Sequence, residues 1–150
     1  MNKKMLTALA ALLLPALAGA QGAPGADETA IRARLATSAE ARNRGDMHGE
    51  VMSYAADGEF LAFGSKVVTG RAGLEKALGG VPPTYTFKLT VDHVRALTAN
   101  VAVADTSVEA GPDAGHVHIF ATYVMVKRGG HWLIGAARVG APMGAIPAPK

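Results

Sequence analysis

The chain has 150 residues and no cysteine. This length favours a single domain, and the lack of cysteine excludes disulfides, zinc–thiolate sites and a cysteine nucleophile. The formal net charge is +3, but the Arg and Lys residues are scattered rather than clustered with aromatic residues, so we expect no nucleic-acid partner.

The first twenty residues are typical of a secretory signal peptide. Lys3 and Lys4 precede an apolar run from Met5 to Leu17, and Ala18-Gly19-Ala20 forms a small-x-small cleavage site. The apolar run is shorter than the ~20 residues that cross a bilayer. We therefore predict a signal peptide over 1–20, no membrane attachment after cleavage, and export to the periplasm or the extracellular space. Cleavage lowers the formal net charge from +3 to +1.

Two helices are predicted at the start of the mature chain, after a Gly/Ala/Pro-rich linker over 21–26. Asp27 can cap the first helix, in which Ile31, Leu35 and Ala39 form one apolar stripe. Gly45 is placed to end this helix near Asn43. Asp46 can cap a second helix, in which Met47, Val51 and Tyr54 recur at helical spacing until Gly58.

The tripeptide Arg44-Gly45-Asp46 matches a cell-adhesion signal, but its position favours a different interpretation. Adhesion signals of this kind lie on extended, exposed loops. Here the glycine ends one predicted helix and the aspartate begins the next. We interpret the tripeptide as a turn.

After Gly58 the apolar period changes to two, which is typical of strands. A third helix is expected over 71–78, and from Ala141 the Pro/Gly/Ala-rich composition predicts a disordered tail over 141–150. The expected domain thus covers 27–140 and is of the α+β class, with a curved antiparallel sheet of about six strands wrapped around three helices. The expected strands are 59–63, 66–69, 84–97, 100–110, 116–127 and 131–139.

Several local sequences resemble the nuclear-transport-factor-2-like, or SnoaL-like, superfamily. They are "NRGD" at 43–46, "YAADGEF" at 54–60, "TGRAGLEKAL" at 69–78 and the closing "VMVKRGGHWLIGAARV" at 124–139. The resemblance implies a cone with one pocket on the concave face of the sheet, often with dimerisation through the convex face. Since this fold hosts isomerases, dehydratases, cyclases, epoxide hydrolases and non-catalytic domains, it does not supply the function.

The catalytic residues of two such families are not carried over. Similarity to ketosteroid isomerase places its tyrosine donor on Ser38, its base on Ala62 and its protonated aspartate on about Thr122. The Tyr-Asp pair of the scytalone-dehydratase-like branch falls on about Ala41-Arg42. None of these residues can fill the corresponding role, and we expect no cofactor.

Strand alternation separates a polar face from an apolar one. If 111–115 closes a hairpin, Glu109 faces His116, Ser107 faces His118 and Asp105 faces Phe120. The resemblance places this polar face, which includes Thr122 and Val124, on the concave side. The opposite row contains Val117, Ile119, Ala121, Tyr123 and Met125.

Three interpretations of the polar face stay open. It could be a solvated rim, a ligand pocket with Asp105 and His118 as an acid–base pair, or a metal site that adds Glu109 and His116. We take Asp105 and His118 as candidate catalytic residues and assign no metal ligand. The candidate pocket residues are Ser38, Tyr54, Phe60, Phe87, Ser107, Phe120 and Thr122.

The sequence thus predicts an exported, non-catalytic protein that binds a small molecule of undefined identity. The alternative is a cofactor-free lyase, isomerase or hydrolase that acts on a small apolar substrate through Asp105 and His118. A homodimer is expected, because the apolar row from Val117 to Met125 is placed outward and is too long to face water. Trp132 and Arg138 are placed together on the convex surface.

Overall fold

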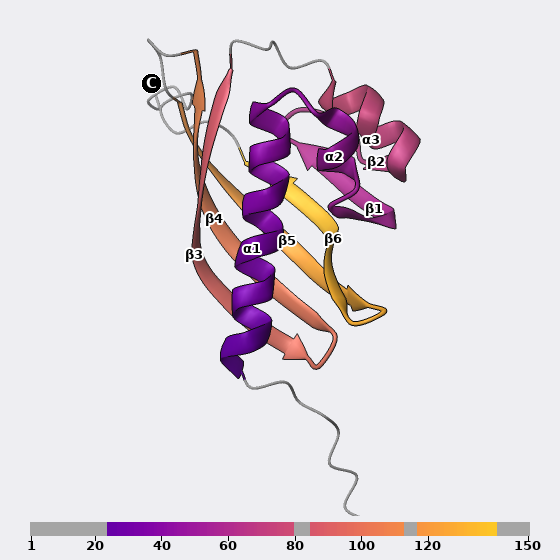
Figure 1. The fold of residues 1–150 in the computed structure, drawn as a ribbon. Coiled ribbons are helices and arrows are strands. Elements are labelled where there is room, and N and C mark those ends of the chain that lie inside the picture. The colour runs from indigo at the N-terminus through magenta and orange to yellow at the C-terminus, as the bar shows by residue number, and fades with distance from the viewer. Residues whose placement is uncertain (1–23, 80–84, 113–116, 141–150) are drawn as a thin grey trace, which may run out of the picture.

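The computed structural model describes residues 24–79, 85–112 and 117–140, which form three helices and six strands (Figure 1). The predicted signal peptide, most of the predicted linker and the predicted tail lie outside these residues. None of the described helices is both long enough and apolar enough to span a bilayer. The helices are α1 (Pro24–Asn43), α2 (Met47–Val51) and α3 (Arg71–Leu78); the strands are β1 (Tyr54–Ala62), β2 (Val68–Thr69), β3 (Thr86–Thr98), β4 (Val101–Gly111), β5 (Val117–Arg128) and β6 (His131–Val139).

The turn between α1 and α2 confirms the interpretation of the Arg-Gly-Asp tripeptide. Gly45 has a φ of 71°, a left-handed conformation that glycine adopts at no steric cost. Asp46 is the N-cap of α2, where its Oδ1 accepts a hydrogen bond of 2.7 Å from the backbone of Gly49. The tripeptide is a helix–helix connection.

Both of the first two helices differ from their predicted bounds. α1 begins at Pro24 rather than Asp27, so Asp27 lies inside the first turn and its carboxylate accepts bonds from Lys127 and Trp132. α2 ends at Val51, and Tyr54 is the first residue of β1. The helical spacing of Tyr54 with Val51 is explained by burial, since both side chains face the same core from two different elements.

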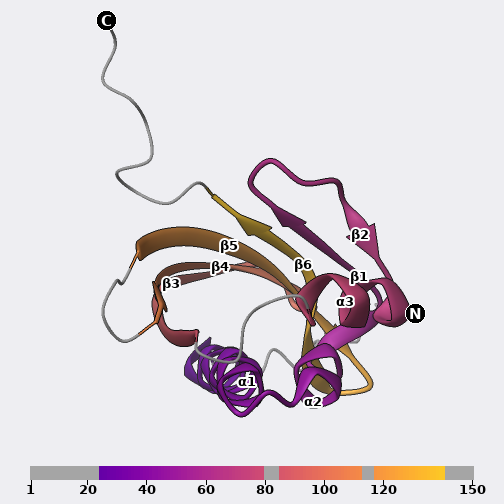
Figure 2. The same ribbon diagram turned by 90° about the horizontal axis from the view of Figure 1, so that it is seen from above.

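The strands form one six-stranded sheet in the order β2-β1-β6-β5-β4-β3, so the predicted α+β fold is confirmed. The sheet is not wholly antiparallel, because β1 runs parallel to β6. The sheet curves, and α1 and α2 lie together on its concave side (Figure 2). We call the side of the sheet that α1 covers the inner face and the other side the outer face.

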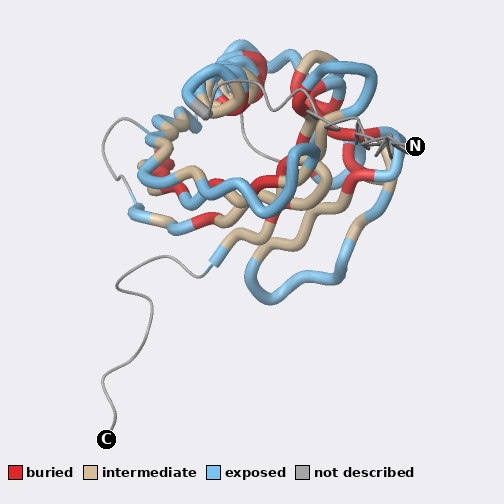
Figure 3. Tube along the Cα trace, turned by 90° about the horizontal axis from the view of Figure 1, so that it is seen from below, coloured by how far each residue is buried: buried red, intermediate tan, exposed pale blue. Residues whose placement is uncertain are grey.

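The core lies between the inner face and the helices, and buried segments occur on both (Figure 3). Ile31 and Leu35 of α1 pack there with Ala104 of β4 and with Met125 and Ile134 of the neighbouring strands. The apolar row that contains Ala121, Tyr123 and Met125 therefore faces inward. The prediction that this row points outward is wrong, because burial of apolar area drives the apolar side of the sheet against the helices.

A bulge in β6 corrects the prediction for Trp132. Met125 pairs with Ile134 but Val124 pairs with Ala136, so Gly135 is an extra residue on β6. The bulge reverses the alternation, so Trp132 is buried on the inner face although Arg138 lies on the outer face, where it bonds to Glu59. The two side chains do not share the convex surface.

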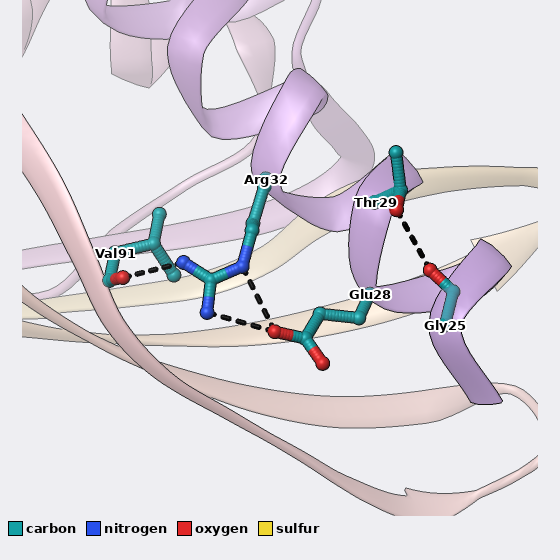
Figure 4. A network of polar contacts seen from close by, with 5 residues as sticks. All are labelled: Gly25, Glu28, Thr29, Arg32 and Val91. Carbon is teal, nitrogen blue, oxygen red and sulfur yellow. Dashed lines mark hydrogen bonds and ion pairs between the residues drawn. The ribbon is translucent and has the colours of Figure 1, made fainter.

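Side chains of α1 cover part of the exposed edge of β3. The side-chain amide of Asn43 donates to the carbonyl of Phe87 and accepts from its N–H, both at 2.8 Å. Arg32 donates to the carbonyl of Val91 at 2.5 Å and is held by Glu28 (Figure 4). These bonds satisfy backbone groups that a free edge strand would expose, and they fix α1 across the inner face.

Candidate functional site

A cavity of about 100 Å³ lies between α1, α2 and the inner face of the sheet. We call it the inner cavity. Its lining combines a few polar side chains with a largely apolar wall. The lining residues are Ser38, Ala39, Arg42, Glu50, Tyr54, Phe60, Phe87, Leu89, Val108, Ile119, Ala121, Tyr123 and Val139.

Helix spacing brings the polar residues of α1 to the cavity. Ser38 and Arg42 are four residues apart and therefore lie on the same face of the helix, one turn from each other. Leu35, one turn before Ala39, is fully buried in the core. The same stripe that anchors α1 in the core thus delivers Ser38 and Arg42 to the inner cavity.

Arg42 and Glu50 form a buried ion pair on the cavity wall. Arg42 donates from Nε to Oε1 of Glu50 at 2.9 Å and also from Nη2 to the same oxygen. The Glu50 side chain is 3% exposed. The guanidinium also stacks over the Phe87 ring, with Cζ 4.8 Å from its centroid. Burial raises the pKa of Glu50, and the nearby Arg42 charge opposes this rise.

Two tyrosines face the same cavity from different strands. Burial raises the pKa of Tyr123 to about 12. Burial also raises the pKa of Tyr54 far above its ordinary value, with further contributions from Tyr123 and Glu50. Both phenols therefore stay protonated at every physiological pH and can donate hydrogen bonds. Among the described residues, neither hydroxyl has a hydrogen-bond partner.

The inner cavity is suited to hold a small, mostly apolar molecule with one polar end. Phe60, Ile119 and Val108 supply apolar wall on the sheet side. The charge of Arg42 is matched by Glu50, so the cavity carries no net charge at neutral pH. Ligand sites commonly combine such apolar walls with a few polar groups that fix orientation.

The structure places four of the candidate pocket residues in this cavity: Ser38, Tyr54, Phe60 and Phe87. Sequence reasoning missed Arg42, Glu50 and Tyr123. Tyr123 could have been found by assigning the apolar row of β5 to the inner face, and Arg42 by its spacing from Ser38. Nothing in the sequence distinguished Glu50, because its partner comes from another helix.

The remaining candidates lie on the outer face, and the expected pairing across β4 and β5 is wrong. Asp105 pairs with Thr122, Ser107 with Phe120 and Glu109 with His118, a register displaced by two residues. The displacement preserves the faces but separates Asp105 from His118. Both side chains are exposed, and Asp105 accepts a 2.8 Å bond from Thr122. The structure therefore does not bring Asp105 and His118 together as an acid–base pair.

The structure also bears on the metal interpretation. His116 lies outside the described residues. Within 24–79, 85–112 and 117–140, no group of three or more His, Asp or Glu side chains is arranged to hold a metal ion. Glu109 instead pairs with Lys88 at 3.5 Å.

A second, more open hollow of about 400 Å³ lies at the opposite end of α1. Asp27, Glu28 and Trp132 line it together with the end of the β3–β4 hairpin. Hydrogen bonds from Lys127 and Trp132 lower the pKa of Asp27. Both carboxylates thus already have partners within the protein: Asp27 accepts from Lys127 and Trp132, and Glu28 pairs with Arg32. Neither carboxylate is therefore free to bind a ligand in this hollow.

Solved structures with this architecture are numerous, although no family model and no curated protein matches the chain. A ketosteroid isomerase-like protein from Erwinia carotovora atroseptica SCRI1043 is 18% identical, with a TM-score of 0.68 over 77% of this chain and 95% of that one. An NTF2-like protein of unknown function from Pseudomonas putida KT2440 is 23% identical, with a TM-score of 0.70 over 85% and 96%. A further NTF-2 like protein of unknown function, from Shewanella oneidensis MR-1, is 17% identical, with a TM-score of 0.68 over 77% and 99%.

These similarities confirm the predicted resemblance at the level of the fold. At such identities the neighbours share the architecture, and their activities do not transfer to this chain. The function must be argued from the inner cavity itself.

Proposed function

We propose that this protein, which has the nuclear-transport-factor-2-like cone fold, is an exported protein that binds a small neutral molecule in the inner cavity without transforming it. The observation that carries the proposal is the composition of the cavity wall. It joins apolar side chains to a buried ion pair and to two protonated phenols.

The absence of catalysis is argued from the same side chains. Glu50 is engaged by Arg42 through two hydrogen bonds, and Tyr54 and Tyr123 hold their protons at physiological pH. The enzyme alternative rested on Asp105 and His118, which lie apart on the outer face. Within the described residues, the cavity wall holds no other carboxylate and no histidine.

The binding function can be tested with two neighbouring residues of β5 that face opposite sides. Ile119→Trp fills the inner cavity, whereas Phe120→Trp places the same indole ring on the outer face. Ligand-observed NMR with a set of small neutral carbonyl compounds should detect binders to the wild type and to Phe120→Trp, but not to folded Ile119→Trp. Equal binding by all three proteins would refute the inner cavity as the site.

Export is a separate part of the proposal and rests on the signal-peptide pattern of residues 1–20. Mass spectrometry of the protein isolated from its host should give a chain that begins at Gln21. A chain that begins at Met1 would contradict export by this route.

We also propose a homodimer, through a different surface from the one predicted. The outer face carries a half-exposed apolar patch formed by Val101, Val103, Val124, Val126 and Leu133. A self-complementary two-fold contact is the usual way to cover such a patch. In light scattering, Val124→Glu should lower the mass from two chains to one, and a monomeric wild type at micromolar concentration would contradict the dimer.

A further inference from the structure

The Arg42–Glu50 pair leaves one buried carboxylate oxygen without a partner. Both hydrogen bonds from Arg42 go to Oε1 of Glu50. Oε2 is buried and has no hydrogen-bond partner among the described residues. Leaving a buried charged oxygen unsatisfied is costly, so this oxygen is an acceptor that a donor on a bound molecule would complete.

Donors lie on the same cavity wall. The hydroxyls of Ser38, Tyr54 and Tyr123 make no hydrogen bond within the described residues, and the residues all line the inner cavity. The phenols of Tyr54 and Tyr123 stay protonated, so each can donate to an acceptor atom. The wall of the inner cavity therefore combines one buried, unsatisfied acceptor with several donors.

The volume of the inner cavity and the charges on its wall restrict the class of ligand further. The cavity of about 100 Å³ is smaller than the roughly 150 Å³ apolar cavity that holds benzene in an engineered protein. A carboxylate ligand would bring a second negative charge beside Glu50, whose own charge already matches that of Arg42. A small neutral molecule fits both constraints.

We propose that the inner cavity recognises a small neutral molecule in which an N–H or O–H donor stands next to a carbonyl, as in a lactam. The donor hydrogen-bonds to Glu50 Oε2, and the carbonyl accepts from the phenol of Tyr123. The apolar remainder of the molecule packs against Phe60 and Ile119. This inference rests on the proposed binding function and adds to it the chemical class of the ligand.

The test compares two probes of the same ring size that differ in a single group. In 2-pyrrolidinone an N–H stands next to the carbonyl, whereas γ-butyrolactone has a ring oxygen in its place. We expect 2-pyrrolidinone to bind at least about tenfold more tightly, a difference of ~1.4 kcal/mol, since its N–H adds a hydrogen bond to a charged acceptor. Backbone amide NMR shifts at Ile119, Ala121 and Tyr123 measure the dissociation constant of each probe.

Two variants test which residues cause the preference for 2-pyrrolidinone over γ-butyrolactone. Glu50→Gln should reduce the tenfold preference to less than about twofold, because the charged acceptor is lost. Tyr123→Phe should weaken both probes by a similar factor and preserve the preference, because both carbonyls lose the same donor. Tyr123→Phe also serves if Glu50→Gln does not fold, since a changed preference in that variant contradicts the assigned roles.

Each outcome separates the ligand class from the binding function. Equal affinities of the two probes at the inner cavity would overturn the proposed ligand class and leave the binding function standing. Tighter binding of acetate than of 2-pyrrolidinone would also overturn the class. Failure of every probe to shift inner-cavity residues would overturn both proposals.

Discussion

The inner and outer faces of β4 and β5 come from the same two segments of sequence, yet they are different environments. On β5 the inner residue Met125 is fully buried, whereas the outer residue Phe120 is 55% exposed. On the inner side, polar groups occur as a buried ion pair and protonated phenols. On the outer side they occur as exposed contacts such as Asp105 with Thr122.

The difference shows that polar composition does not by itself mark a binding site. The outer face has more ionisable side chains on these strands, but water surrounds them. On the inner face a few polar groups are removed from water, so each unmet hydrogen bond matters. This contrast makes quantitative predictions.

The largest contrast is expected between two ion pairs. Glu50→Ala leaves the Arg42 charge buried and unpaired, and it should lower the free energy of unfolding by ~3–5 kcal/mol. Glu59→Ala breaks the pair with Arg138 on the outer face, where both side chains are about 40% exposed, and it should cost at most ~1 kcal/mol. Urea unfolding measures both, and equal losses would break the distinction between the two faces.

Two apolar residues of β5 test the same contrast without charge. Met125→Ala removes a side chain that is fully buried in the core and should cost ~2–5 kcal/mol. Phe120→Ala on the outer face should stay within about 0.5 kcal/mol of the wild type. A large loss for Phe120→Ala in a monomeric sample would show that the outer face is also covered.

The pH dependence should separate Asp27 from Glu50. Hydrogen bonds from Lys127 and Trp132 lower the pKa of Asp27, so its stabilising contribution is present above the ordinary pKa of 3.8 and is lost as the pH falls through the folded-state pKa. Asp27→Asn should therefore flatten the loss of stability below about pH 4. Urea midpoints between about pH 2.5 and 4 measure this slope, and an unchanged slope would contradict the role of Asp27.

Glu50 changes the stability with pH in the opposite direction from Asp27, and it does so at higher pH. Its raised pKa means that the folded state holds the proton longer than the unfolded chain does, so this group makes stability fall as the pH rises from 4.5. The two carboxylates can therefore be distinguished in one titration series.

The smallest effects are expected for Asp105 and His118. Since both are exposed and the register separates them, Asp105→Ala and His118→Ala should each change the free energy of unfolding by less than ~0.5 kcal/mol. The double variant should equal the sum of the two. Coupling between them would mean that the two side chains interact after all.

The sequence predicted the order of elements, the six strands and the turn at Gly45 because each depends on local residue types. It also separated the two faces of β4 and β5 correctly. It did not reveal which face α1 covers, because that depends on contacts between distant segments. Period alone likewise could not reveal the Gly135 bulge or the two-residue register between β4 and β5, and the hairpin that sets this register includes residues outside the described range.

Only part of the candidate site was predicted, because the rest depends on contacts between distant segments. Ser38, Tyr54, Phe60 and Phe87 were found through the family resemblance and their aromatic or polar character. Arg42 and Glu50 come from two helices whose packing creates the pair, and neither stands out alone. Tyr123 was recognised as part of an apolar row, but that row was assigned to the outer face. Tyr123 was therefore not included among the candidate pocket residues.

The most direct test of the inner cavity uses the tyrosines as reporters. The protein contains three tyrosines, of which Tyr54 and Tyr123 line the cavity and Tyr85 is exposed. In ¹⁹F NMR of protein labelled with 3-fluorotyrosine, addition of 2-pyrrolidinone should move the signals of Tyr54 and Tyr123 and leave that of Tyr85 in place. Movement of the Tyr85 signal alone, or of none of the three, would contradict the account.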